Sequence, residues 1–315
     1  MGKLYKLKKQ FKTNLPQFCL NGMSNLWIVK PSGNSKGQGI HLISDIEEAM
    51  INGSQNQARI IQKYVETPLI FFDPEFPLLH NKKFDIRQWV LVSSVTPLKI
   101  HMFSASYLRT CSSEFDLRDF KDPMKHLTNF SVNKTQYKGR LEDSICSSLE
   151  FARYLKTTHN VDWDTQIKPG FVNLITETIL SVTDQLVHKP GCFELYGFDI
   201  LLDQNYKPWL LEVNLSPACA ERTPWLTEML DYMTEGMLKI VLPKTVLATD
   251  EVPDPDSVEL PKKDKYQWEL IYTGEDVGGV ANGNNIMIAN DLEILGTKAD
   301  IKKEKDLDKL YHQYM

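Results

Sequence analysis

The stretch from Cys192 to Glu221 places the strongest constraint on how this chain can fold. Two apolar and aromatic segments, Phe193 to Leu202 and Trp209 to Leu215, flank the polar run D-Q-N-Y-K-P at residues 203–208. Apolar segments separated by a few residues with turn chemistry are typical of a β-hairpin. The sequence therefore predicts two antiparallel strands whose connection is centred near Asn205.

Three oxygen-bearing side chains fall on one face of this predicted hairpin. Asp199 and Glu212 are roughly equidistant from its centre, so they can face each other across the strand pair. Asn214 lies two residues beyond Glu212 and points to the same face. Buried carboxylates are costly unless they are paired or bind a cation, and this donor set suits Mg²⁺. We therefore predict a magnesium site, the alternative being a half-exposed hairpin with a solvated polar face.

Charged residues alternate along a second predicted strand, Lys82 to Val92. Lys83, Asp85 and Arg87 recur at every second position and share one face, while the apolar residues between them point the other way. A row of cation, anion and cation can hold phosphate oxygens while the carboxylate orders the cations. The alternative is a solvent-facing strand edge with a ladder of charges.

A glycine-rich segment follows a short apolar strand near the N-terminus. The strand L-W-I-V-K-P at residues 26–31 leads into S-G-N-S-K-G-Q-G-I at residues 32–40. Glycines allow backbone N–H groups there to close on phosphates, and Lys30 would lie at the mouth of the loop as a point charge. The ending of a Walker A loop is absent, and a mobile surface loop is the alternative interpretation.

Helical periodicity marks three further segments, residues 143–155, 169–188 and 224–242. A proline-rich, acidic stretch then indicates a linker. Beyond it the sequence predicts a short strand, Tyr266 to Tyr272, and a charged tail with little regular structure.

Composition excludes several classes of function. The chain has 315 residues, of which 42% are hydrophobic and 24% charged, as in an ordinary soluble globular protein of one large or two ordinary domains. Its net charge of −5 gives no support to nucleic-acid binding. No apolar run approaches the roughly 18 residues of a membrane span, and no secretory signal or myristoylation pattern is seen. Five scattered cysteines without metal-ligand spacing suit a reducing compartment, so we expect a cytosolic protein.

Seven motifs occur in order along the chain, and together they indicate a family. They are W-I-V-K-P with G-Q-G-I, I-Q-K-Y-V-E-T-P, K-F-D-I-R-Q-W-V-L-V, S-Y-L-R-T, H-L-T-N-F-S-V-N-K, F-E-L-Y-G-F-D and W-L-L-E-V-N-L-S-P-A-C-A. The set resembles the tubulin–tyrosine ligase-like family, whose members are ATP-grasp ligases, over roughly Leu26 to Lys244. The resemblance implies an α+β ATP-grasp fold, in which antiparallel sheets with flanking helices clasp ATP between two lobes.

The resemblance also implies a division of the chain. We expect a basic N-terminal arm at 1–25, the ATP-grasp ligase domain at 26–244, the linker at 245–262, and a C-terminal strand with a poorly ordered tail at 263–315. Little precedes the first motif, so the small N-terminal domain of the family is expected to be truncated.

Site roles follow from the resemblance residue by residue. The residues implied to bind ATP are Lys30, Lys36, Gly37, Gln38, Gly39 and Ile40 at the phosphates, Gln62, Lys63, Tyr64 and Val65 at the adenine, and Lys83, Asp85, Thr128 and Asn129 nearby. Arg87 and Arg109 are implied to hold carboxylate or phosphate groups at the reaction centre. Asp199, Glu212 and Asn214 match the ligands of Mg²⁺, or of Mn²⁺ in its place.

Within the family the chain looks most like the tubulin glycylases of the monoglycylase type. The insertion F-D-P-E-F-P-L-L-H before K-F-D-I-R and the strand K-Y-Q-W-E-L-I-Y after the linker carry this likeness. It implies ATP-dependent joining of glycine to glutamate side chains in tubulin C-terminal tails through an acyl phosphate. The implied protein is a monomer of the cytoplasm and cytoskeleton, including the cilium and axoneme, that binds microtubules but neither nucleic acid nor membrane.

Two other functions stay open at this point. A polyglutamylase of the same family would use a cationic pocket to hold the side-chain carboxylate of an incoming glutamate. A catalytically inactive microtubule-binding module is suggested by the short N-terminal region, although the intact set of Lys30, Arg87, Asp199, Glu212 and Asn214 argues against it.

Overall fold

The computed structural model describes Lys6, Gln10 and residues 24–32, 36–44, 58–138, 140, 142–187, 189, 191–219, 223–242 and 266–275. Those from Ser24 onward lie in one compact unit, Asn21–Gly279. The predicted linker at 245–262 lies outside the described residues, as do most of the predicted N-terminal arm and the charged tail.

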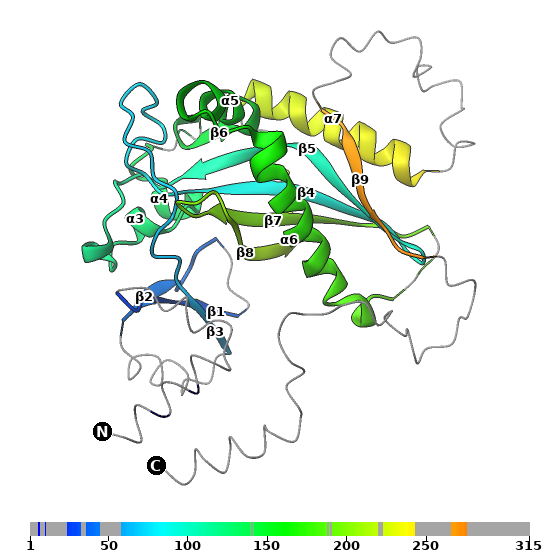
Figure 1. Ribbon diagram of the computed structural model, residues 1–315, viewed down its shortest axis with the longest axis horizontal. Helices are drawn as coiled ribbons and strands as arrows, with labels where there is room; N and C mark the ends of the chain where they lie inside the picture. The colour runs from blue at the N-terminus through cyan, green and yellow to red at the C-terminus, as the bar shows by residue number, and fades with distance from the viewer. Residues whose placement is uncertain are drawn as a thin grey trace. The chain divides into compact units, whose positions relative to one another are not determined.

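A large antiparallel sheet forms the centre of this unit (Figure 1). Its strand order is β6-β5-β4-β7-β8, and β9 pairs with β5 beside β6. The strands are β4 (Phe84–Val95), β5 (Leu98–Thr110), β6 (Ile145–Ser147), β7 (Glu194–Leu202), β8 (Pro208–Leu215) and β9 (Trp268–Thr273). The predicted hairpin is confirmed as β7 and β8, and the strand expected after the linker is confirmed as β9.

A second, smaller sheet holds the N-terminal strands. It has the order β2-β1-β3, with β1 at Trp27–Pro31, β2 at His41–Ile43 and β3 at Arg59–Lys63, all antiparallel. An apolar cluster that includes Leu26, Ile28 and Leu42 packs this sheet against Leu127 and against Phe115, Leu117 and Phe120. Two antiparallel sheets with flanking helices confirm the α+β architecture.

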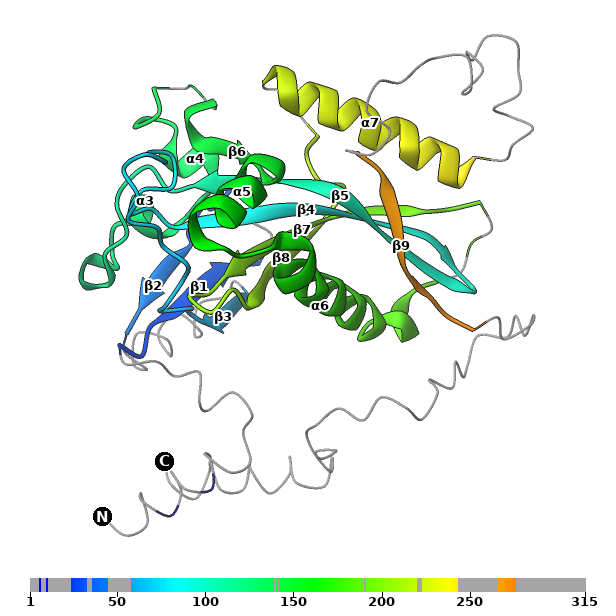
Figure 2. The same cartoon turned by 45° about the horizontal axis from the view of Figure 1, so that its top comes forward.

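Helices cover both faces of the large sheet (Figure 2). The α-helices are α3 (Pro123–His126), α4 (Phe130–Asn133), α5 (Ser148–Tyr154), α6 (Lys168–Leu180) and α7 (Pro224–Val241). Short 3-10 or π turns occur at Leu117–Asp119, Glu142–Ser144, Leu155–His159, Trp163–Ile167 and Thr183–Gln185. One core joins α5 and α6 to the face that carries Ile86, and another joins α7 to the face that carries Trp89. None of the helices among the described residues is long and apolar enough to cross a membrane.

Two of the three predicted helices differ from the structure. The segment at 143–155 is helical only from Ser148, because residues 145–147 pair with β5 as strand β6. The helix predicted at 169–188 ends at Leu180, where the hydroxyls of Ser181 and Thr183 donate to carbonyls of the last turn. Hydroxyl side chains that bond nearby carbonyls compete with continued helix, and periodicity alone does not reveal that competition.

Strand β9 fastens α7 to the large sheet. Trp268 Nε1 donates to the carbonyl of Met233 in α7 (2.9 Å), and its ring lies 5.2 Å from that of Phe103 in β5. At Gly236 an added Cβ would lie 2.9 Å from Trp268 Cδ1, so the helix approaches the indole closely at this glycine. Strand β9, which follows the predicted linker, is therefore an integral part of the sheet.

Replacing Trp268 by alanine should lower the free energy of unfolding by about 2–3 kcal/mol, because it removes a large packed ring and leaves the Met233 carbonyl without its donor. Urea unfolding of the full chain measures this change. Leu270→Ala is the matched control, since Leu270 lies on the same strand but is 55% exposed. It should cost about 0.5 kcal/mol or less, and equal losses for the two variants would contradict the assigned role of Trp268.

Candidate active site

A cavity of about 250 Å³ lies where residues of the two sheets meet. Every predicted site residue lines it except Gly39 and Arg87. The predicted residues that line it are Lys30, Lys36, Gly37, Gln38, Ile40, Gln62, Lys63, Tyr64, Val65, Lys83, Asp85, Arg109, Thr128, Asn129, Asp199, Glu212 and Asn214. Segments separated by more than 150 residues in sequence therefore contribute to one cavity.

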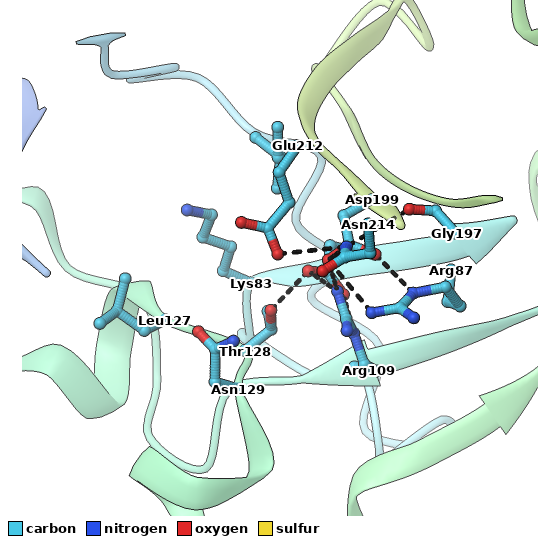
Figure 3. Close-up of polar contacts among 12 residues, drawn as sticks. Lys83, Arg87, Arg109, Leu127, Thr128, Asn129, Gly197, Asp199, Glu212 and Asn214 are labelled. Atoms are coloured by element: carbon cyan, nitrogen blue, oxygen red, sulfur yellow. Dashed lines mark hydrogen bonds and ion pairs between the residues drawn. The ribbon is translucent and has the colours of Figure 1, made fainter. Parts of the chain in front are cut away.

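The β7–β8 hairpin places its polar side chains as its register predicts. Asp199 is directly opposite Glu212, and Gly197 is opposite Asn214. Asn214 Nδ2 lies 3.3 Å from Asp199 Oδ2 and 3.3 Å from Glu212 Oε1, so the three side chains converge on one face (Figure 3). Two carboxylates and an amide are thus brought together at the edge of the sheet.

Two arginines and two aspartates form a buried network across β4, β5 and β7. Arg87 Nε donates to Asp199 Oδ1 (2.6 Å), and Arg109 Nη2 lies 2.9 Å from Asp199 Oδ2. Arg109 also donates to both oxygens of Asp85 (2.8 and 2.6 Å). Thr128 Oγ1 completes the set with a 2.6 Å hydrogen bond to Asp85 Oδ2. Asp85 therefore orients Arg109, a contact that the row of charges on one strand did not indicate.

The two carboxylates of the hairpin differ in their ionisation. Burial acts to raise the pKa of Asp199, but Arg109 and Arg87 outweigh it and hold that pKa below its ordinary value. The Glu212 residue is exposed at the cavity, but partial desolvation of its carboxylate and the neighbouring charge of Asp199 raise its pKa. Glu212 is therefore a carboxylate whose negative charge the surrounding groups do not fully offset.

Lys83 is anchored at the other end of the cavity. It is 5% exposed and donates to the Tyr64 hydroxyl (3.0 Å) and to the His126 carbonyl (2.9 Å). Burial lowers its pKa to about 8. The Tyr64 hydroxyl is also 2.9 Å from His126 Nδ1, while His126 Nε2 lies 3.1 Å from the Asp119 carbonyl. These bonds tie the residue just before β4 to the segment after β3 and to the end of α3.

The small sheet reaches the hairpin directly. Lys30 Nζ donates to the Leu211 carbonyl (2.9 Å), and Gln62 Nε2 donates to the Leu210 carbonyl (3.3 Å). Burial lowers the pKa of Lys30, although the nearby charge of Glu212 acts to raise it. Lys30 thus connects β1 to β8, a contact that its position in the sequence did not indicate.

The end of the glycine-rich segment uses backbone conformations that favour glycine. Gly37 and Gly39 have φ of 77° and 74°, in the left-handed region. A Cβ at Gly37 would lie 3.0 Å from both Asn129 Oδ1 and Val132 Cγ2, so the loop packs closely on the start of α4. The Ser131 hydroxyl, which donates to the Lys36 carbonyl, fixes the same contact.

Several cavity residues were not predicted from the sequence. They are Ile28, Pro31, His126, Leu127, Leu201, Trp209, Leu210 and Leu211. Most are apolar, and His126, Leu210 and Leu211 contribute backbone carbonyls that accept hydrogen bonds from Lys83, Gln62 and Lys30. Side-chain chemistry gives no signal for such positions, and only their proximity to the predicted residues could have suggested them.

The donor set fits a hard divalent cation. Glu212 and Asp199 offer carboxylate oxygens, and Asn214, whose Nδ2 faces both of them, would offer its amide oxygen after rotation of the amide group; these are the ligands that Mg²⁺ prefers. Asp199 and Glu212 face each other across the hairpin, and desolvation and the charge of Asp199 raise the pKa of Glu212, so a bound cation would offset the repulsion between the two carboxylates. Among the described residues no group of three or more His, Cys, Asp or Glu side chains could hold a metal, so the amide and non-protein oxygens would have to complete the coordination.

The fold and the site define a class: an α+β protein of two antiparallel sheets with a charged cavity lined by both. Residues 3–249 match the tubulin-tyrosine ligase family, and the chain belongs to that family. The resemblance carried by the seven ordered motifs is confirmed.

Curated relatives include several named tubulin glycylases. The chain is 48% identical to "Tubulin glycylase 3E" of Tetrahymena thermophila, in a match covering 100% of this chain and 23% of that protein. It is 31% identical to "Tubulin glycylase 3A" of Drosophila melanogaster, over 84% of this chain and 26% of the relative. It is 30% identical to the human "Tubulin monoglycylase TTLL3", over 74% and 31% respectively. The chain thus spans between about a quarter and a third of the length of these relatives.

The two carboxylates of the hairpin should respond to amidation in opposite directions. Glu212 has a raised pKa, so its favourable contribution to folding is present below its unfolded pKa and is lost as the pH rises through its folded pKa. At pH 7 without metal or nucleotide, Glu212→Gln should therefore raise the melting temperature, and the gain should disappear below about pH 4.

Asp199→Asn is the matched comparison. The pKa of Asp199 is lowered, so its contribution is present above its unfolded pKa and is lost as the pH falls through its folded pKa. Asp199→Asn should cost about 3 kcal/mol at pH 7, because two buried guanidinium groups lose their shared carboxylate. Melting temperatures of both variants, measured in chelator from pH 3 to pH 8, test the two predictions. Shifts of the same sign for Glu212→Gln and Asp199→Asn at pH 7 would contradict the opposite ionisation assigned to the two carboxylates.

Proposed function

We propose that the chain carries an ATP-grasp domain that acts as a tubulin glycine ligase. It would use ATP to join glycine to glutamate side chains in tubulin C-terminal tails. The observation that carries the proposal is the cavity that Asp85, Arg109, Asp199, Glu212 and Asn214 line together. Arg109 bonds both aspartates there, and Arg87 bonds Asp199 from outside the cavity lining. Family membership and the names of the glycylase relatives support the reaction and the substrate.

The proposed reaction has two steps. The glutamate carboxylate takes the terminal phosphoryl group of ATP, which gives an acyl phosphate and ADP. The amine of glycine then attacks the acyl carbon, phosphate leaves, and the nitrogen loses a proton as the amide forms. A carboxylate oxygen is a poor leaving group and phosphate is a good one, so positioning and charge neutralisation are the main tasks of the protein.

Charges around the cavity suit these tasks. Asp199, Glu212 and Asn214 would hold Mg²⁺ or Mn²⁺, which when bound supplies charge neutralisation for the phosphates. Arg109, held by two aspartates and 14% exposed, would present its guanidinium to phosphate or carboxylate oxygens. Arg87, on the other side of Asp199, would act beside it on the substrate carboxylate.

The nucleotide-binding residues divide between the two sheets. Lys30 and the segment Lys36–Ile40, including Gly39, would cover the phosphates. Gln62, Lys63, Tyr64 and Val65 would line the adenine pocket, with Lys83, Asp85, Thr128 and Asn129 on the opposite side. Asp85 would act mainly by orienting Arg109, since Arg109 and Thr128 already donate to its oxygens.

The partners proposed are glycine and the acidic tails of tubulin in microtubules, with the chain acting as a monomer in the cytoplasm and cytoskeleton, the cilium included. Incubation of the 315-residue chain with tubulin, ATP and either glycine or glutamate tests the activity. Mass spectrometry of the tubulin tails should show added glycine residues that require ATP. Added glutamate would establish a polyglutamylase instead, and unmodified tails with retained microtubule binding would establish an inactive module.

Arg87→Lys should fold normally and bind ATP, yet ligate at least about tenfold more slowly. Guanidinium offers parallel donors in a fixed fork, whereas ammonium is a point charge, and losing one charge-assisted bond in the transition state costs about 1.5–3 kcal/mol. Single-turnover ligation measured beside nucleotide affinity and melting temperature checks this.

The surface substitution Arg118→Lys is the control for this prediction. Arg118 pairs with Asp116 but its side chain is 92% exposed, so its replacement should leave all three measurements unchanged. Ligation by Arg87→Lys at the parent rate would remove Arg87 from the reaction centre. A markedly lower melting temperature would make its role structural.

A further inference from the structure

Gly197 lies in the interior of β7, where a glycine weakens a strand. It is buried and faces Trp89 on β4 and Asn214 on β8. Its φ lies outside the left-handed region, so backbone conformation does not call for glycine here. A glycine within a strand also marks a site that another group approaches closely. The glycine at position 197 therefore indicates that another group occupies the space of the missing side chain.

Two groups fill that space. A Cβ on Gly197 would lie 2.7 Å from Pro217 Cβ and 2.9 Å from Arg87 Nη1, with Arg87 Cδ at 3.2 Å. Gly197 and Asp199 share one face of β7, and from this position Arg87 donates to Asp199 Oδ1 (Figure 3). The guanidinium thus lies over the bare Cα of Gly197 while it bonds the aspartate two residues further along.

Pro217 is brought to the same place by a turn at the end of β8. Ser216 has φ 54°, which redirects the chain immediately after the strand, and Pro217 is buried. The Cys219 thiol donates to the Pro217 carbonyl (3.4 Å), and this local hydrogen bond stabilises the turn from Pro217 to Cys219. Gly197 and Pro217 consequently border the same space beside the Arg87 side chain.

We propose that Gly197 and Pro217 form a slot that holds the Arg87 guanidinium against Asp199, which makes Gly197 a positioning residue for ligation. This inference rests on the proposed ligase function. An added methyl would meet Pro217 Cβ first, at 2.7 Å, in the turn that follows the edge strand β8, and Arg87 Nη1 next, at 2.9 Å. Arg87 Nη1 is the end of a flexible side chain, and the Pro217 turn lies outside the paired strands, so both can shift while the strands stay paired. A methyl group at Gly197 would therefore displace Arg87 from Asp199 more readily than it would unfold the sheet.

Arginine side-chain NMR tests the geometry without any assay of activity. In the full chain labelled with ¹⁵N-arginine, the Arg87 Nε–H signal is assigned by its loss in Arg87→Lys. Gly197→Ala should shift that signal or broaden it through exchange, while the Arg109 Nε–H signal, bonded to Asp85, stays in place. An unchanged Arg87 signal in Gly197→Ala overturns the proposal, whether or not the chain ligates.

Single-turnover ligation tests the consequence. Gly197→Ala should ligate at least about tenfold more slowly than the parent, with nucleotide affinity unchanged within about twofold. The control is Gly274→Ala, since the nearest atoms to a Cβ there lie 3.5 Å away, in ordinary contact. In the Arg87→Lys background, Gly197→Ala should add no more than about a twofold loss, because both changes act through one guanidinium.

The outcomes separate this inference from the proposed function. A parent chain that adds no amino acid contradicts the function, and the NMR result then decides the slot alone. The slot alone is overturned if the parent chain is active and Gly197→Ala ligates at the parent rate. It is also overturned if the losses from Gly197→Ala and Arg87→Lys multiply in the double variant. A second variant is used if Gly197→Ala alone fails to fold. Pro217→Gly removes the Cβ that an added methyl at Gly197 would meet at 2.7 Å, so it serves as a new parent chain. Adding Gly197→Ala to this parent should still slow ligation about tenfold, and equal ligation rates for the two chains would again overturn the proposal.

Discussion

The alternation of arginine and aspartate across β4, β5 and β7 is the constraint on which the rest of this structure depends. Burying four charges is costly unless each meets an opposite charge, and the pairs Arg87–Asp199 and Asp85–Arg109 are register partners on neighbouring strands. A slip of one residue would turn these charges into the apolar core under α5 and α6. The network therefore fixes the register of the central strands as well as the shape of the cavity.

The same face of the sheet serves two purposes along its length. At one end Lys83, just before β4, and Asp85 line the cavity, and Arg87 bonds Asp199 beside them. Two residues later Trp89 enters the apolar core beneath α7. Gly197 lies opposite Trp89 at this boundary. A polar site that begins where a packed core ends has side chains whose rotamers are restricted by their neighbours, which is what precise positioning of reacting groups requires.

Glu212 differs from the two aspartates of the site in its charge environment. Asp85 and Asp199 have arginine partners, whereas burial and the charge of Asp199 raise the pKa of Glu212. Such a group costs stability in the isolated chain and offsets that cost when a cation arrives. Stability is commonly lower at functional sites for this reason. The side chain of Lys30, which comes from the other sheet, supplies part of the missing positive charge.

Local patterns in the sequence determined the hairpin, the facing of Asp199 and Glu212, and the charged row of β4, because strand alternation and turn chemistry act over a few residues. The seven motifs determined the family. Tertiary structure alone decided that Asp85 orients Arg109, that Lys30 reaches a carbonyl 181 residues away, and that residues 145–147 form a strand. Each of these depends on which distant strand or side chain becomes a neighbour, and no local periodicity encodes that choice. The close approach of Arg87 and Pro217 to Gly197 was likewise decided by the tertiary structure, since only the folded chain brings these residues together.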